Sequence, residues 1–154
     1  MTDTGPARAI VALSGGFDPP TPGHVSMIQD ARKIGDVVII LNSDAWCNKA
    51  RWSGKRFLSL EVRKGILGLI PGVTRVIPAT DEDGTVCETL RELMPDFFGN
   101  GGDRTPANTP EVQVCRELGI GTLWFLGERV EQHDHDMLKE AVMEANGVND
   151  NEKK

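Results

Sequence analysis

The sequence predicts an α/β protein in which a five-stranded parallel sheet lies between two layers of helices. Short apolar runs rich in β-branched residues alternate with segments whose apolar residues recur at helical spacing. The first strand, helix and following strand, residues 9–41, fit into some thirty residues, the size of one crossover unit. The chain has 154 residues, enough for one domain with a single core and too few for two. We therefore expect a three-layer α/β/α sandwich with right-handed crossovers.

Five apolar runs of strand length occur along the chain. The first ends at Ser14-Gly15-Gly16, and glycines of this kind commonly stop a buried strand. Runs that are apolar throughout are typical of strands covered on both faces, as in a parallel sheet. The expected strands are residues 9–13, 36–41, 73–78, a strand starting at 96–98, and 120–126.

Helical spacing is found between these runs. Ser59 gives a partial cap signal to the second helix, and Pro71-Gly72 ends it. Residues 48–55 have little periodicity and many cations, so we expect a basic loop there. The expected helices are residues 24–33, 59–70, 85–94, 110–118 and 134–146. One domain is predicted over residues 1–147, followed by a disordered polar tail over residues 148–154.

Composition excludes several classes of protein. Hydrophobic residues make up 39% and charged residues 26%, which is too apolar for a disordered chain. The net charge is −6, so the basic excess of a nucleic-acid-binding protein is lacking. No apolar run approaches the roughly 18 residues of a membrane helix, and the N-terminus has no signal core. The three scattered cysteines fit neither a disulfide framework nor a metal knuckle. We expect a cytoplasmic protein without nucleic-acid or membrane partners.

The segment from Gly15 to His24 follows the first expected strand, where α/β sheets bind ligands. Its glycines allow a ligand to approach the main chain, and its prolines stiffen the loop. Thr21 offers a hydroxyl group. His24 opens the next helix, where unpaired N–H groups and the helix dipole favour an anion. The segment is compatible both with a phosphate site and with an ordinary proline-rich turn.

This segment resembles the signature G-x-F-D-x-x-[H/T]-x-G-H of the cytidylyltransferase-like superfamily of nucleotidyltransferases. All its fixed positions are filled, namely by Gly15, Phe17, Asp18, Thr21, Gly23 and His24. Three further segments are similar to the heptose-1-phosphate adenylyltransferase and glycerol-3-phosphate cytidylyltransferase branches. They are Asn42-Ser43-Asp44, Leu60-Glu61-Val62-Arg63 and Gly101-Gly102-Asp103-Arg104. The resemblance implies a Rossmann-like nucleotidyltransferase fold and covers residues 10–103 well.

The resemblance also implies a reaction. CMP or AMP would pass from CTP or ATP, with Mg²⁺, to a small phosphate monoester such as a sugar phosphate or a glycerol-phosphate-like alcohol phosphate, and pyrophosphate would leave. His24 and Thr21 would donate to the α-phosphate, Lys49 would reach over it, and Arg63, at the exposed start of its helix, would bind the leaving phosphates. The implied nucleotide-binding residues are Gly15, Gly16, Phe17, Asp18, Gly23, Gly102, Asp103 and Arg104. The implied acceptor-binding residues are Asn42 and Asp44.

Alternative interpretations exist for several of these residues. Thr21 could instead cap the helix with its hydroxyl. Asp18 could be a turn residue that bonds to its own main chain. Arg51 is an alternative to Lys49 as the cation over the α-phosphate. Where relatives open the last helix with hydroxyl residues, this chain has acids and histidines, among them His133, Asp134 and His135. These three are candidate metal ligands or parts of an ordinary helix cap, and no metal site is assigned from them.

Two expectations concern the whole molecule. The altered last helix leaves open a second function, a degenerate module that binds a nucleotide or sugar phosphate without turnover. Relatives are often dimers, and Trp46 and Trp52 add apolar surface beside the basic segment. We therefore expect a homodimer with two-fold symmetry.

Overall fold

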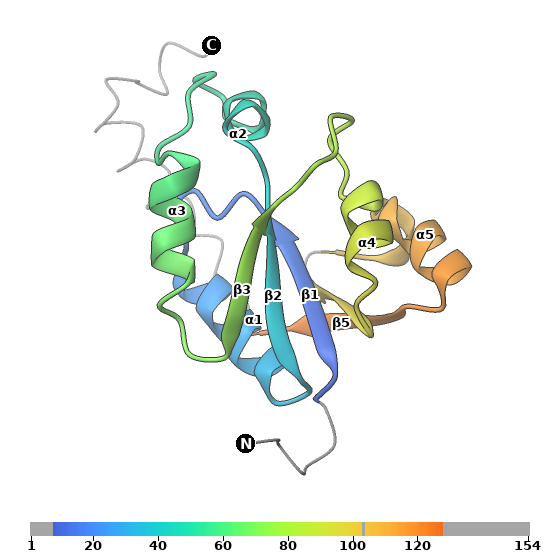
Figure 1. Ribbon diagram of the computed structural model, residues 1–154. Helices are drawn as coiled ribbons and strands as arrows, with labels where there is room; N and C mark the ends of the chain where they lie inside the picture. Colours follow the sequence, from blue (N-terminus) through green and yellow to red (C-terminus); the bar gives the residue numbers. More distant parts are fainter. Residues whose placement is uncertain (1–7, 103, 128–154) are drawn as a thin grey trace.

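A computed structural model describes residues 8–102 and 104–127. Five parallel strands form one sheet in the order β3-β2-β1-β4-β5 (Figure 1). The strands are β1 (Ile10–Gly15), β2 (Asp36–Leu41), β3 (Val73–Pro78), β4 (Phe97–Gly101) and β5 (Gly121–Leu126). The predicted α/β sandwich with five parallel strands is confirmed.

Helices cover both faces of the sheet (Figure 1). They are α1 (Pro22–Arg32), α2 (Asp44–Ala50), α3 (Leu60–Leu67), α4 (Cys87–Leu93), the 3₁₀ turn η1 (Pro106–Asn108) and α5 (Glu111–Leu118). Helices α1 and α3 lie on one face, and α4 and α5 lie on the other. Along β1, Val11 and Leu13 belong to the core under α1 and α3, whereas Ala12 belongs to the core under α4 and α5. This alternation is the period-two pattern of a strand buried on both faces.

Two expectations about elements need correction. The first strand continues through Gly15, which pairs with Leu41, so the glycine does not stop it. The expected basic loop over residues 48–55 is wrong in its first half, because α2 extends to Ala50. The Ser43 hydroxyl accepts the Trp46 N–H and caps α2. A helix of seven residues is too short to show apolar periodicity, which is why the sequence pattern missed it.

Other boundaries agree more closely with the prediction. The strands at residues 36–41 and 73–78 have the expected limits. Ser59 caps α3 through the Val62 N–H, as its cap signal indicated, although α3 ends at Leu67, three residues earlier than expected. The expected helix 134–146, the tail 148–154 and the domain limit at 147 lie outside the described residues. Within residues 8–102 and 104–127, no helix is both long and apolar enough to cross a membrane.

Candidate active site

The direction of the strand order changes at β1, which lies between β2 and β4. The loop after β1 leads to α1 on one face of the sheet, and the loop after β4 leads to η1 and α5 on the other face (Figure 1). In α/β proteins, two loops that diverge in this way flank the crevice at the carboxyl ends of the strands in which ligands bind. The segment from Gly15 to His24 forms one wall of this crevice.

The start of this segment is packed tightly against its surroundings. A Cβ atom on Gly16 would lie 2.8 Å from the Trp46 ring, so only glycine fits there. Phe17 has φ of 48°, a left-handed conformation that is rare for a bulky residue, and its side chain is buried. Its ring meets the His24 ring edge-on, with centroids 4.7 Å apart. Packing against the rings of Trp46 and Phe17 therefore fixes the main chain of the loop and the imidazole of His24.

Thr21 and His24 form a reciprocal cap at the start of α1. The Thr21 hydroxyl accepts the His24 main-chain N–H at 3.3 Å, and His24 Nδ1 accepts the Thr21 N–H at 3.0 Å. Because Nδ1 accepts, the proton of the neutral imidazole is assigned to Nε2. The alternative interpretation of Thr21 as a cap is confirmed, and its hydroxyl keeps a proton to donate.

Asp18 connects this loop to the segment after α2. Its carboxylate accepts the main-chain N–H groups of Phe57 and Leu58 at 2.8 and 2.6 Å and the Arg51 Nε–H at 3.2 Å. Arg51 also donates to the main-chain oxygen of Asp18. The Asp18 side chain is only 6% exposed. Asp18 was predicted to bind nucleotide, but its contacts tie two loops together across the site. These distant partners give no local sequence signal.

Arg63 differs most from its predicted setting. We expected an exposed residue at the start of its helix, but Arg63 is 0% exposed. Its guanidinium donates to three main-chain oxygens, those of Gly16, Asn42 and Leu58, at 2.8, 2.8 and 3.1 Å. A fourth bond of 2.8 Å joins it to the Asp44 carboxylate. The predicted exposure of Arg63 is therefore wrong. Its guanidinium is buried because it supplies donors to the main-chain oxygens of separate loops.

The two predicted acceptor-binding residues lie at the end of β2. Asn42 is buried, and its main chain bonds both to Gly15 in β1 and to Arg63. The Asp44 carboxylate is 40% exposed, accepts a hydrogen bond from Arg63 and forms an ion pair with Arg56 Nε at 3.3 Å. Two arginines thus hold this carboxylate beside the motif segment.

Lys49, the predicted mobile cation, and Arg51, the alternative to it, differ in their exposure and contacts. Lys49 is exposed in the last turn of α2. The Arg51 side chain is 19% exposed because it pairs with Asp18. Of the two, Lys49 keeps the reach expected of a mobile point charge, whereas Arg51 is fixed at the wall of the crevice.

The loop after β4 forms the opposite wall. Gly102 and Arg104 are partly exposed there, and Arg104 Nη1 lies 3.9 Å from the buried carboxylate of Glu111 in α5. Asp103, His133, Asp134 and His135 lie outside the described residues. Among residues 8–102 and 104–127, no three His, Cys, Asp or Glu side chains form a group that could hold a metal ion.

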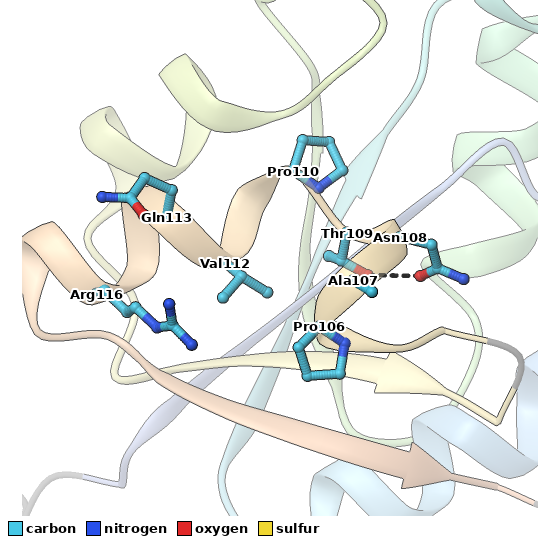
Figure 2. A pocket seen from close by; sticks show the side chains of 8 residues that line it. All are labelled: Pro106, Ala107, Asn108, Thr109, Pro110, Val112, Gln113 and Arg116. Carbon is cyan, nitrogen blue, oxygen red and sulfur yellow. Dashed lines mark hydrogen bonds between the residues drawn. The ribbon is translucent and has the colours of Figure 1, made fainter.

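A pocket lies between η1 and α5 (Figure 2). None of its lining residues belongs to the motif segment or to the residues tied to it. They are Pro106, Ala107, Asn108, Thr109, Pro110, Val112, Gln113 and Arg116. The chemistry of the crevice comes from the motif residues, so we place the candidate site there and not in this pocket.

With this geometry in view, comparison with known proteins identifies the family. The model of the family described as cytidylyltransferase-like matches residues 12–118, from β1 to the end of α5. The chain belongs to the cytidylyltransferase-like family. The predicted resemblance to these nucleotidyltransferases is confirmed. The matched range contains every described site residue of this family member.

Curated relatives agree with this assignment. The chain is 35% identical over 111 residues to the bifunctional protein HldE of Streptomyces coelicolor, which covers 71% of this chain and 24% of that protein. It is 33% identical over 98 residues to the bifunctional protein HldE of Haemophilus influenzae, a match that covers 63% of this chain and 20% of that protein. The chain therefore spans about a quarter of the length of these curated relatives.

Solved structures share the fold of this cytidylyltransferase-like protein. A lipopolysaccharide core biosynthesis protein from Thermoplasma volcanium superposes with a TM-score of 0.61 at 23% identity, covering 80% of this chain and 98% of that one. A putative nicotinate-nucleotide adenylyltransferase from Vibrio parahaemolyticus superposes with a TM-score of 0.56 at 16% identity, covering 92% of this chain and 90% of that one. At these identities the likeness concerns the fold alone.

Proposed function

We propose that this chain transfers CMP or AMP from CTP or ATP to a small phosphate monoester and releases pyrophosphate. The observation that carries the proposal is the Thr21–His24 cap, because it fixes the His24 imidazole at the start of α1 with Nδ1 as acceptor, which leaves Nε2–H as the donor of the ring. Membership of the cytidylyltransferase-like family supports the same reaction class. The acceptor is a sugar phosphate or a glycerol-phosphate-like alcohol phosphate.

In this reaction a phosphate oxygen of the acceptor attacks the α-phosphorus and forms a new P–O bond. The bond between the α-phosphorus and its bridging oxygen breaks, and pyrophosphate takes the electron pair. The protein has to align two anions and neutralise the charge that grows on the α-phosphate. Mg²⁺ enters with the triphosphate as part of the substrate.

Each part of the site contributes to this task. His24 Nε2–H and the Thr21 hydroxyl donate to the α-phosphate oxygens, and the loop main chain near Phe17 lies against the phosphates. Lys49 adds a mobile charge over the acceptor phosphate. Arg63 acts from beneath, because its bond to the Gly16 oxygen holds the loop in place. We therefore replace its predicted contact with the leaving phosphates by a positioning role.

The proposal is tested by pyrophosphate release from CTP, ATP, UTP and GTP with a panel of phosphate monoesters. We expect release only when a suitable triphosphate and acceptor are both present, and strongly reduced release with His24→Ala. A protein that binds triphosphate tightly but releases no pyrophosphate with any acceptor would contradict the proposal and favour a binding module.

A further inference from the structure

Trp46 is a residue of α2 that touches the motif segment and has no role in the proposed reaction so far. Its side chain is partly exposed, and its six-membered ring lies against Gly16. A Cβ atom at position 16 would be 2.8 Å from Cζ3 of this ring and 3.4 Å from Cε3. The indole Nε1–H donates to the main-chain oxygen of Gly84 at 3.3 Å, between β3 and α4. Trp46 therefore joins the loop after β1 to the loop after β3.

The main-chain oxygen of Gly16 is held by two other residues. Arg63 Nη1 donates to it at 2.8 Å, and the Cys47 Sγ atom lies 4.0 Å from it. Both of these side chains are buried. The peptide between Gly16 and Phe17 is trans, and the C=O and N–H groups of a trans peptide point in opposite directions. The N–H of this peptide, which Phe17 contributes, therefore points away from Arg63 and Cys47.

The Phe17 N–H is a donor with a fixed direction. Within residues 8–102 and 104–127, no main-chain or side-chain acceptor takes it. The φ angle of Phe17 is 48°, a conformation that a bulky residue keeps only when its surroundings hold it in place. A main-chain N–H that is held in this way and has no acceptor in the described protein suits an anionic ligand.

We propose that Trp46 is a positioning residue whose ring holds the Gly16–Phe17 peptide so that the Phe17 N–H can donate to the triphosphate, an inference that rests on the proposed function. The bond to Gly84 keeps the indole in place against the peptide. Glycine is needed at position 16 because any side chain there would displace the ring or the peptide. The requirement for glycine then comes from the Trp46 ring and not from the ligand.

A double-mutant cycle of Gly16→Ala and Trp46→His tests this role. Calorimetry measures the affinities of the folded proteins for CTP, ATP and inorganic tripolyphosphate, a probe without a nucleoside. Histidine keeps a five-membered ring with an N–H group but lacks the six-membered ring that meets Gly16, and at pH 8 an ordinary imidazole is neutral.

Each single substitution should weaken the binding of tripolyphosphate, and of whichever nucleotide binds, by about tenfold, the scale for losing a hydrogen bond to a charged group. In the Trp46→His background, the further change Gly16→Ala should cost less than about threefold, because the ring that the methyl group would meet is already gone. This rescue is the expected signature of positioning.

Two controls separate positioning from a structural role. Gly65→Ala is matched to Gly16→Ala, because a Cβ atom at Gly65 would meet no atom within 4 Å, and it should leave every affinity unchanged. Thermal unfolding of each variant measures stability separately, and a merely structural role would lower the unfolding temperature without changing the affinity of the folded protein. If Trp46→His does not fold, Trp46→Leu, which also lacks the six-membered ring, takes its place in the cycle.

Several results would overturn the inference. If Gly16→Ala costs the same in both backgrounds, the methyl group itself obstructs the phosphates and Trp46 has no positioning role. Wild-type affinity in Gly16→Ala, or in the folded Trp46 variant, also overturns the inference while leaving the proposed function intact. A wild-type protein that binds neither nucleotide nor tripolyphosphate overturns both.

Discussion

Replacement of Arg63 by alanine should destabilise the whole protein and not only its substrate complex. The guanidinium is 0% exposed and donates to three main-chain oxygens and the Asp44 carboxylate. Hydrogen bonds from a charged group contribute about 1.5–3 kcal/mol each, but bonds within one network do not add. Removing one partner of a buried ionic network typically costs about 3–5 kcal/mol. We expect a loss of that size, against a total stability of about 5–15 kcal/mol for a domain.

Urea unfolding followed by circular dichroism measures this loss. Lys64→Ala is the matched control, because Lys64 is the next residue in α3 and is exposed, so its removal should change the free energy of unfolding by less than about 0.5 kcal/mol. Arg63→Lys should fall between the two, since lysine keeps the charge but loses the fixed fork of donors. An Arg63→Ala protein as stable as Lys64→Ala would refute the buried network and return Arg63 to an exposed phosphate-binding role.

Four further predictions concern other parts of the molecule. His24→Ala should lower kcat by ~10²–10³-fold with a much smaller change in nucleotide affinity, because its donor acts mainly on the charged transition state; unchanged turnover in steady-state kinetics would argue against it. Thr21→Ala should cost about 1 kcal/mol in urea unfolding through the lost cap, and Thr21→Ser should restore most of it. Burial raises the pKa of the Cys115 thiol from 9.0 to about 11, so the contribution of Cys115 to stability should be fully present below pH 9 and be lost as the pH rises toward 11, and stability should fall less steeply over that range in Cys115→Ala. Light scattering at micromolar concentration should give the mass of a homodimer, and a monomeric mass would contradict the dimer inferred from Trp46 and Trp52.

Local patterns were sufficient to predict the sheet. The runs at residues 36–41 and 73–78 match β2 and β3 because a strand buried on both faces needs apolar, β-branched residues throughout. The Thr21 cap is also local, since both of its bonds join residues three apart. Gly16 was predicted to let a ligand approach the main chain; the group that lies against it in the structure is the Trp46 ring, which comes from the unpredicted helix α2.

The rest depends on contacts that no local pattern contains. Arg63 lies two residues after the exposed Glu61 in a helix and was predicted to be exposed, yet its partners Gly16 and Asn42 are 47 and 21 residues away. Asp18 likewise bonds to Phe57 and Leu58, about forty residues later in the chain. A charged side chain is buried when distant loops present enough oxygens or N–H groups to satisfy it, and this depends on the completed fold.

The transfer itself is tested most directly by following the label of a radioactive triphosphate. CTP and ATP, each labelled with ³²P at either the α- or the γ-phosphate, are incubated with the wild-type protein, Mg²⁺ and the phosphate monoester panel, and with His24→Ala as the control. We predict that α-label enters an acceptor-linked diphosphate while γ-label leaves as pyrophosphate, and that both conversions drop together in His24→Ala. Transfer of γ-label to the acceptor, or no conversion of either label by a protein that binds the nucleotide, would contradict nucleotidyl transfer.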